Sequence, residues 1–359
     1  MQGGERTPIL EAAMGDGTTL ASIGLNETEF RLLFDRPPHP EFDWGEHATS
    51  VRLWPPARRP FLYDWWFDRS VARELKNWRA DIFVSTDGML SRRTSIPQLT
   101  VFHDLNFMHH PEWMPAKEAQ YYRTRFPEFA ELASRIVTVS EFSKADIVQQ
   151  FGIPSSKIDV VYNAPSSVYR PSTQSESLKA AKEFTGGHPY FIFVGSLHPR
   201  KNMKGLLDAF RLYRNAGGKN HLLIVGEHMW KGKEVEVDAV HFVGRLDRNQ
   251  LPLAMAGSEG LVFVPWFEGF GVPMVEAFAS GVPVVASNAT AMPEVCSGAA
   301  AYLVDPGNPH QIAESMMGLE RDLACRTDAI ERGLSRAQDF SWDRSAASLW
   351  NSMEHLLQQ

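Results

Sequence analysis

The chain has 359 residues, of which 43% are hydrophobic and 22% charged, a length that predicts about two domains with ample core. Ordinary apolar content and only two cysteines, Cys296 and Cys325, exclude a collagen-like chain, a disordered tail protein and a disulfide-stapled miniprotein. A formal net charge of −7 disfavours binding to polynucleotides, so we expect no nucleic-acid partner.

The N-terminal sequence has neither the basic region nor the unbroken apolar stretch of a signal peptide. No run elsewhere approaches the ~18 apolar residues that a membrane span requires. We therefore expect a cytoplasmic protein, with peripheral contact to the inner face of a membrane left open. A helix-like segment starts near Thr7 and Pro8, and residues 30–35 form the first strand that the pattern predicts.

Aromatic and basic side chains interleave in the next segment, from residue 52 to residue 79. The aromatic members are Trp54, Phe61, Tyr63, Trp65, Trp66, Phe67 and Trp78, and the basic ones are Arg52, Arg58, Arg59, Arg69, Arg73, Lys76 and Arg79. Such a mixture occurs at membrane interfaces and in sugar-acceptor grooves, and either use would suit a lipid-linked acceptor. An ordinary helix packed by its aromatic residues is the commoner origin of such a pattern.

From Ile82 onward, short apolar runs alternate with amphipathic stretches, which predicts β-α-β units and parallel sheets. Strands are expected at 81–85, 98–102, 136–139 and 158–162, and then at 190–194, 221–225, 240–243, 260–265 and 283–286. A helix between the third and fourth begins after Ser140 and ends at Gly152. Pro, Ser and Gly are enriched between residues 164 and 189, which predicts a linker between domains 1–168 and 186–340.

The stretch from Phe263 to Ser287 carries the most chemical information. Parallel sheets bind ligands beyond the carboxyl ends of their strands, and Glu268, Gly269, Phe270 and Gly271 follow such an end directly before a helix. The two glycines allow close approach of an anion, and the N-H groups of the helix start stabilise a phosphate. Glu276 lies eight residues after Glu268, so both carboxylates could face sugar hydroxyls; alternatively, the glycines only shape a turn and Glu276 is a solvated helix residue.

A second segment in the same domain places Arg200 and Lys201 just after the strand at 190–194. Two cations at the carboxyl end of a strand can neutralise a diphosphate, the arginine through its forked guanidinium and the lysine as a point charge. An isolated pair of this kind is usually a solvated surface feature. Its place in the same sheet as the glutamate motif favours a binding role.

These two segments, with TVFHDLNF, TVSEFSKADI, VVYN and the terminal FSW helix, resemble retaining glycosyltransferases of family 4, from about Ile82 to the C-terminus. The resemblance implies the α/β GT-B fold, in which two Rossmann-like domains face each other across a cleft. It also implies that the final helix, residues 341–359, crosses back to the first domain. The first strand of the family is not evident in the N-terminal sequence.

Carried over by position, the resemblance assigns Glu276 to the ribose hydroxyls, Glu268 to the donor sugar, and Arg200 and Lys201 to the diphosphate. The backbone of residues 269–272, Gly269, Phe270, Gly271 and Val272, would contact donor and phosphate. Gly195 and Ser196 fall in the donor loop. Ser196 stands where many members carry an arginine, and Arg200 is expected to supply that charge.

His103, at the end of a predicted strand, matches the family histidine near the transferred sugar, although a histidine beside an aspartate is commonly structural. The family's chemistry is same-face attack without an assigned protein nucleophile, so none is named. The sequence has no Asp-x-Asp pair and no zinc-binding spacing, so we expect neither a metal nor a resident cofactor. His109 and His110 are interpreted as loop residues.

The expected activity is transfer of a hexose from a nucleotide diphosphate sugar to a saccharide or lipid-linked acceptor. Similarity to members with HPRKN favours mannose from GDP-mannose, with UDP-linked donors left open. The alternatives are a catalytically inactive nucleotide-sugar binder and another GT-B enzyme such as a nucleotide-sugar epimerase. A nicotinamide dehydrogenase is disfavoured because no GxGxxG follows a strand.

Overall fold

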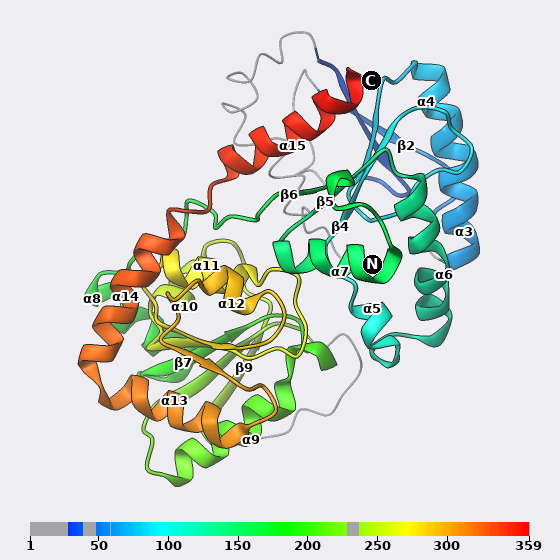
Figure 1. The fold of residues 1–359 in the computed structure, drawn as a ribbon. Helices are drawn as coiled ribbons and strands as arrows, with labels where there is room; N and C mark the ends of the chain where they lie inside the picture. The colour runs from blue at the N-terminus through cyan, green and yellow to red at the C-terminus, as the bar shows by residue number, and fades with distance from the viewer. Residues whose placement is uncertain (1–27, 39–47, 58, 228–236, 359) are drawn as a thin grey trace. The chain divides into compact units, whose positions relative to one another are not determined.

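The structure is a computed structural model that describes residues 28–38, 48–57, 59–227 and 237–358. The helix-like segment expected near Thr7 therefore lies outside the described residues. The chain divides into two compact units, one of residues 1–163 with 342–359 and one of residues 164–341. In Figure 1 the colour runs from green to orange through the second unit, and the last helix, which belongs to the first unit, is red.

The division of the chain differs from the predicted boundaries at the linker. The predicted first domain ended at residue 168 and the second began at 186, whereas residues 164–185 belong to the second unit. Helix α8 (Gln174–Thr185) packs there against α10 (Gln250–Ala256). The hydroxyl of Ser172 also donates a hydrogen bond to the carbonyl of Ala256, at 2.7 Å.

The described strands of the first unit form two parallel sheets, in the orders β1-β2 and β3-β4-β5-β6. Their bounds are β1 Phe30–Phe34, β2 Ala48–Arg52, β3 Phe83–Ser85, β4 Gln98–Phe102, β5 Arg135–Thr138 and β6 Ile158–Val160. The central strand β4 is buried along its whole length, as expected for a strand covered on both faces. Its bounds, and the start of the first described strand at Phe30, agree with the sequence prediction.

The helices of the first unit follow local sequence signals. Their bounds are α3 Pro60–Trp65, η4 Trp66–Val71, α4 Ala72–Trp78, α5 Asn106–His109, η5 Pro111–Trp113, α6 Ala116–Leu132, α7 Glu141–Phe151, η6 Ser155–Lys157 and α15 Trp342–Leu357. Helix α7 begins as predicted, with the Ser140 hydroxyl accepting from the Ser143 N-H at 3.0 Å, and ends at Gly152 with φ +67°. On α15, Ser345 donates to the Tyr162 carbonyl at 2.6 Å, which ties the last helix to this unit.

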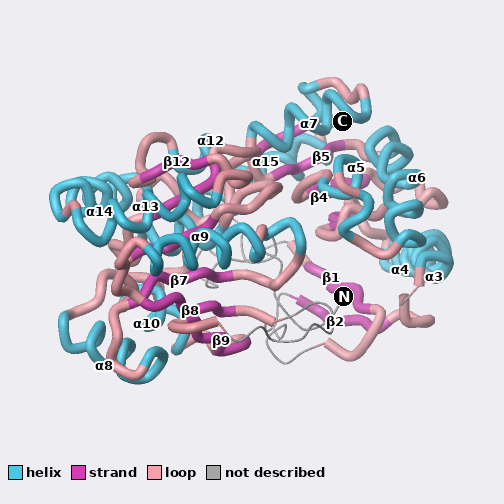
Figure 2. Tube along the Cα trace, turned by 90° about the horizontal axis from the view of Figure 1, so that it is seen from below, coloured by secondary structure: helices cyan, strands magenta, loops and turns pink. Residues whose placement is uncertain are grey.

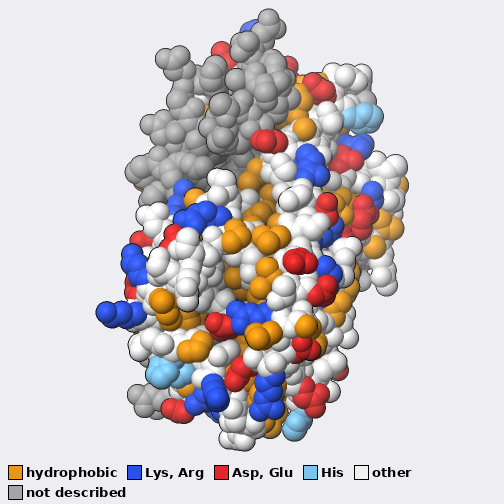
Figure 3. Space-filling view, turned by 90° about the vertical axis from the view of Figure 1, so that its left-hand side faces the viewer, with side chains coloured by type: hydrophobic (Ala, Val, Ile, Leu, Met, Phe, Trp, Pro, Cys, Tyr) orange, Lys and Arg blue, Asp and Glu red, His pale blue; other side chains and the backbone are white. Residues whose placement is uncertain are grey.

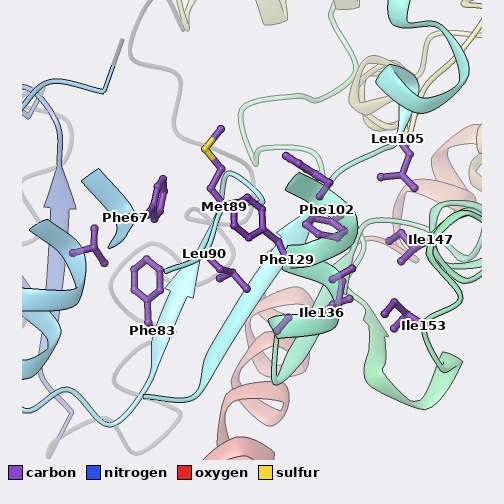
Figure 4. Packing of buried hydrophobic residues seen from close by; sticks show 14 of the residues in the cluster. Phe67, Phe83, Met89, Leu90, Phe102, Leu105, Phe129, Ile136, Ile147 and Ile153 are labelled. Atoms are coloured by element: carbon purple, nitrogen blue, oxygen red, sulfur yellow. The ribbon is translucent and has the colours of Figure 1, made fainter. Parts of the chain in front are cut away.

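The core of the first unit lies between the sheet and its helices (Figure 4). Phe102 stacks on Phe126 of α6 at a centroid distance of 5.0 Å, and Phe67 of η4 contacts Phe83 of β3 at 6.4 Å. A cavity of about 590 Å³ lies between β1 and β3, which do not pair, and is also lined by α4 and α15.

The second unit is a parallel sheet in the order β12-β11-β10-β7-β8-β9, in which β7 lies beside β8 and β8 beside β9 (Figure 2). Its strands are β7 Tyr190–Val194, β8 His221–Val225, β9 Val240–Gly244, β10 Gly260–Phe263, β11 Val284–Ser287 and β12 Tyr302–Val304. Its other elements are η7 Pro199–Lys201, α9 Met203–Asn215, α11 Val272–Ala279, α12 Met292–Cys296, α13 Pro309–Arg321 and α14 Leu323–Ala337, besides α8 and α10.

Helices cover both faces of this sheet. Helix α9 packs against α13 on one face, and α11 packs against α14 and α10 on the other (Figure 1). The strands β8 and β10 are almost wholly buried, as a doubly covered parallel sheet requires. The sheet therefore presents its ligand-binding edge at the carboxyl ends of its strands.

Candidate functional site

Two loops meet at the carboxyl edge of the second sheet. The first runs from the end of β7 through η7 to α9, and the second runs from the end of β10 to α11. Because β7 and β10 are hydrogen-bonded neighbours, these loops leave the sheet side by side. The Trp266 N-H donates to the Arg200 carbonyl at 2.8 Å, so the two loops are joined through their backbones.

The first loop is fixed by a short helical turn. The His198 ring accepts a hydrogen bond from the Arg200 N-H at 3.3 Å, and Pro199 begins the turn, where its missing N-H costs nothing. Asn202 ends it with φ +58°. The Asn202 amide donates to the carbonyls of Val264 and Pro306, at 3.1 and 2.8 Å, so its own burial is compensated.

Arg200 and Lys201, which this turn presents, share one carboxylate. Glu268 bonds Arg200 Nη1 and lies 2.6 Å from Lys201 Nζ, both through its Oε1. Glu268 and Lys201 are each 7% exposed. One carboxylate thus bonds two cations at the carboxyl end of the sheet, where burial makes ionic contacts stronger than at the exposed surface.

The Lys201 ammonium has a second partner in the floor of the site. It lies 4.8 Å from the centroid of the Phe263 ring, the last residue of β10. A cation over an aromatic face is attracted by the negative charge of the ring surface. The ring therefore helps to hold the ammonium beside the end of β10.

The turn before α11 needs glycine at residue 271. Gly271 has φ +90°, and a Cβ there would lie 2.9 Å from the methyl carbons of both Met274 and Met292. Phe270 is buried and packs edge-on against Phe340 at 5.5 Å. The side chain of Phe270 thus anchors the turn, and only its backbone can serve the predicted contact with the donor.

The structure also places Gly195 and Ser196 at the predicted site. Gly195 follows β7 with φ +150°, and a Cβ built on it would lie 3.5 Å from Lys201 Cε. The Ser196 carbonyl accepts from the His198 N-H at 2.8 Å and so helps to close the first loop. Residue 196 is a serine where many family members have an arginine. The guanidinium in the ion cluster of Arg200, Lys201 and Glu268 is that of Arg200.

Glu276 is on α11, one turn into the helix, and is half-buried. The Tyr169 hydroxyl donates a hydrogen bond to its carboxylate. Burial, followed by the nearby Glu276 carboxylate, raises the pKa of Tyr169, so the phenol remains a donor at neutral pH. Glu276 is thus oriented by a residue near the start of the second unit.

His103 lies in the first unit, just after β4. Its Nε2 is 3.1 Å from the Thr86 carbonyl, and because a carbonyl only accepts, this nitrogen carries the hydrogen. The His103 carbonyl accepts from the Ser143 hydroxyl at 3.4 Å. Both the ring and the backbone carbonyl of His103 are therefore held by hydrogen bonds.

The interpretation of His109 and His110 as loop residues is wrong for His109. It is the last residue of α5, and its Nε2 lies 2.8 Å from the buried Asp146 carboxylate of α7. His110 stacks on Trp113 at 3.8 Å. The two helices are thus joined by a polar contact that spacing along the chain could not reveal.

Sequence reasoning missed Thr290 and Tyr169. The Thr290 hydroxyl accepts from the Glu268 N-H at 3.2 Å, and Tyr169 bonds Glu276. Neither residue belongs to a motif, since each is brought to the site by the fold from a distant part of the chain. Within the residues that the structure describes, no group of three or more His, Cys, Asp or Glu side chains could hold a metal ion.

Comparison with known proteins identifies the family of the chain. The model for "Glycosyl transferases group 1" matches residues 174–336, and that for "Glycosyltransferase Family 4" matches residues 27–164. O-antigen chain mannosyltransferase B of Escherichia coli is 30% identical over 312 residues, which are 83% of this chain and 81% of that protein. The chain belongs to glycosyltransferase family 4.

Other family 4 relatives cover less of the chain. O-antigen chain mannosyltransferase RfbU of Salmonella typhimurium (strain LT2) is 25% identical over 190 residues, 51% of this chain and 50% of that protein.

None of the helices in the described ranges is long and apolar enough to cross a membrane.

Solved structures establish the fold. Sucrose-phosphate synthase from Thermosynechococcus elongatus matches with a TM-score of 0.76 at 16% identity, covering 99% of this chain and 94% of that one. HepE from Anabaena, solved in complex with UDP-glucose, matches with a TM-score of 0.74 at 17% identity, covering 99% and 98%. The expected GT-B fold class is thereby confirmed.

Proposed function

We propose that this family 4 chain transfers mannose from GDP-mannose to a saccharide or lipid-linked acceptor, with retention of configuration at the sugar. The choice of sugar rests on relatives named as mannosyltransferases, one of which is 30% identical over 312 residues. The ion cluster of Arg200, Lys201 and Glu268 is the observation that carries the donor site, because it offers a diphosphate two cations at a strand end.

The donor is bound by the second unit in this proposal. Arg200 and Lys201 bind the diphosphate, and Glu276, held by Tyr169, accepts hydrogen bonds from the ribose hydroxyls. Glu268 accepts from the sugar hydroxyls, and the backbone around Gly271 and Gly195 contacts the phosphates. The half-buried Glu276 suits a carboxylate that exchanges water for ribose hydroxyls on binding, whereas Glu268 would exchange its ion pairs for the sugar hydroxyls.

The proposed transfer step uses the two cations, Arg200 and Lys201, to stabilise the leaving group. The acceptor oxygen bonds to C1 of the sugar on the face from which the diphosphate leaves, the C1–O bond to phosphate breaks, and the acceptor proton passes to the departing phosphate. Arg200 and Lys201 stabilise the negative charge that grows on the leaving diphosphate, and we propose that they do so in place of a metal ion. His103 donates its Nε2 hydrogen to Thr86, so its Nδ1 is the nitrogen available to a sugar hydroxyl.

The acceptor is the less defined partner. The relatives named for O-antigen chains favour a polysaccharide acceptor. We propose that this acceptor is lipid-linked and that the protein is cytoplasmic, in peripheral contact with the membrane. UDP-sugar transfer is the second candidate donor chemistry, because HepE, of the same fold, was solved with UDP-glucose.

The test is a transfer assay with radiolabelled GDP-mannose and UDP-glucose on mannose-containing oligosaccharides, with NMR of the product. Label in the oligosaccharide from GDP-mannose, an α-linkage, and equal rates with EDTA or Mg²⁺ are expected. An inverted linkage or loss of activity with EDTA would contradict the proposed chemistry. Binding without transfer would point to an inactive nucleotide-sugar binder, and product without acceptor would point to an epimerase.

A further inference from the structure

The segment α3-η4-α4, residues 60–78, has two chemically distinct stripes. Its buried stripe consists of Phe67, Val71 and Leu75, with Trp66 beside it. These residues belong to the apolar core of the first unit (Figure 4). The opposite stripe consists of Phe61, Trp65, Arg69, Arg73 and Lys76, all exposed.

The change of helix type keeps this exposed stripe aligned. Residues four apart overshoot a full turn by about 40° in an α-helix. In a π-helix, with its wider turn, residues four apart fall short of a full turn. Residues 61, 65, 69 and 73 pass through α, then π, then α geometry, so the two drifts offset each other. The stripe is therefore one surface with aromatic residues at one end and cations at the other.

The aromatic end of the stripe is well exposed to solvent. Phe61 is 66% exposed and Trp65 44% exposed. Trp54, in the preceding loop, is 73% exposed, and its carbonyl accepts from the Ser70 hydroxyl of η4 at 2.5 Å. The Ser70 contact places the backbone of Trp54 beside Arg69. Phe61 and Trp65, one helical turn apart and both exposed, form the apolar end of the stripe, and exposed apolar side chains of this size mark an interaction site.

The acidic residues of the segment are neutralised on its other side. Asp64 is paired with Arg125 of α6 at 2.6 Å, and Asp68 with Arg92 at 2.5 Å. Glu74 is paired with Arg31 of β1 at 2.6 Å. Each of these carboxylates is less than a quarter exposed.

The cations of the segment, in contrast, are left for an external partner. Arg69, Arg73 and Lys76 have no acidic partner among the described residues, and the same holds for Arg52, Arg59 and Arg79 around them. On the face that Figure 3 presents, Lys and Arg side chains are interspersed with Asp and Glu. A net-negative chain thus carries a locally basic surface edged by tryptophans.

We propose that the stripe Phe61, Trp65, Arg69, Arg73 and Lys76, with Trp54 beside it, docks the first unit on an anionic phospholipid bilayer. The cations bind the lipid phosphates, and the aromatic rings enter the headgroup region, where their flat, amphipathic shape is favoured. The inference rests on the proposed function only in the purpose it gives to docking, which is to bring the enzyme to a lipid-linked acceptor. Exposed tryptophans favour a bilayer over a polyanion such as DNA, which the cations alone would bind.

The experiment is co-sedimentation of the full chain with vesicles of phosphatidylglycerol and phosphatidylethanolamine, and with pure phosphatidylcholine vesicles. Binding to the anionic vesicles only, weakening with salt, is expected. R69Q/R73Q should lower the partition coefficient roughly 25-fold, since each basic residue near an anionic membrane contributes about fivefold. F61S/W65S should lower it at every salt concentration.

A matched control is available on α8 of the second unit. Leu178 is 66% exposed, like Phe61, and the exposed Lys179 and Lys182 lie beside it. L178S and K179Q/K182Q should leave vesicle binding unchanged. The shift of melting temperature with GDP, measured on every variant, reports donor binding separately from docking.

Three results would overturn the docking surface. These are absence of binding to anionic vesicles at low salt, equal losses in the α8 variants, and binding to a DNA duplex with no binding to vesicles. Each of them, found with an intact GDP response, would leave the proposed transferase function standing. Loss of the GDP response with retained vesicle binding would instead contradict the donor site.

Discussion

Lys201 Nζ lies 2.6 Å from Glu268 Oε1, so the two residues that flank the candidate diphosphate position neutralise each other in the ligand-free protein. Arg200 joins the same carboxylate oxygen. Under the proposed function, an incoming diphosphate competes with Glu268 for both cations, and the carboxylate is released toward the sugar hydroxyls. Donor binding would then be coupled to the arrangement of these three side chains.

Replacing Glu268 by Gln tests this relationship. The ligand-free protein should lose about 3 kcal/mol of unfolding free energy, because a nearly buried ammonium loses the charge of the carboxylate that it pairs with. GDP affinity should rise while transfer falls, since the competing anion and the sugar contact are removed together. Urea unfolding with and without GDP measures the first effect, and calorimetry the second.

The control for that variant is Glu259→Gln. Glu259 also pairs with an arginine, Arg326, but both side chains are a quarter or more exposed and outside the site. Loss of this ion pair should lower the free energy of unfolding by less than about 1 kcal/mol and leave GDP binding unchanged. Equal destabilisation of the two variants, or weaker GDP binding by E268Q, would argue against the competition.

Glu276→Ala should weaken GDP binding by on the order of 1 to 3 kcal/mol, because it removes the acceptor of the ribose hydroxyls. Tyr169→Phe should weaken it less, since the carboxylate stays but loses the hydroxyl that orients it. Calorimetry on both variants measures which substitution weakens GDP binding more. Tyr302→Phe removes a hydroxyl that bonds Cys325 and serves as the control; unchanged affinity in E276A would remove Glu276 from the site.

His103→Ala should leave GDP affinity within error and cut the transfer rate, because the ring belongs to the first unit and not to the nucleotide site. Initial rates at saturating donor measure this. His110, which stacks on Trp113, provides the comparison variant. Normal turnover in H103A would return His103 to a purely structural role.

The stability of the second unit should depend on pH through three stacked histidines. His221 stacks on His188 at 4.0 Å, and its Nδ1 lies 2.8 Å from His241 Nε2. Burial first, then the charges of these neighbours, lowers the pKa of His221 to about 4. The unfolded chain, with a histidine pKa of about 6.5, binds this proton before the folded chain does. The contribution of His221 to the free energy of unfolding is thus fully present above about pH 6.5 and is lost as the pH drops toward 4.

Substituting Phe for His221 keeps the stacked ring and removes the titration. The melting temperature of H221F should fall less than that of the parent between about pH 7 and pH 4.5. The matching variant His310→Gln, at the start of α13, should follow the parent curve. Parallel curves for H221F and the parent would exclude the effect.

Local sequence signals predicted those parts of the fold that are set locally. Strands 98–102, 190–194 and 221–225 have their predicted bounds, since each is an apolar run that a parallel sheet buries on both faces. Contacts between distant segments could not be predicted in this way. Tyr169 on Glu276, Thr290 on Glu268 and Asp146 on His109 join residues whose spacing carries no signal.

Donor preference tests the central claim most directly. The measurement is the melting temperature of the full chain with GDP, GDP-mannose, UDP, UDP-glucose and ADP, in parallel with Glu276→Ala. Ligand bound to the folded state raises the melting temperature by mass action. We predict a rise with GDP and GDP-mannose that E276A reduces. A rise with UDP ligands alone would contradict the mannosyl donor, and no rise with any of them would contradict the nucleotide-sugar site.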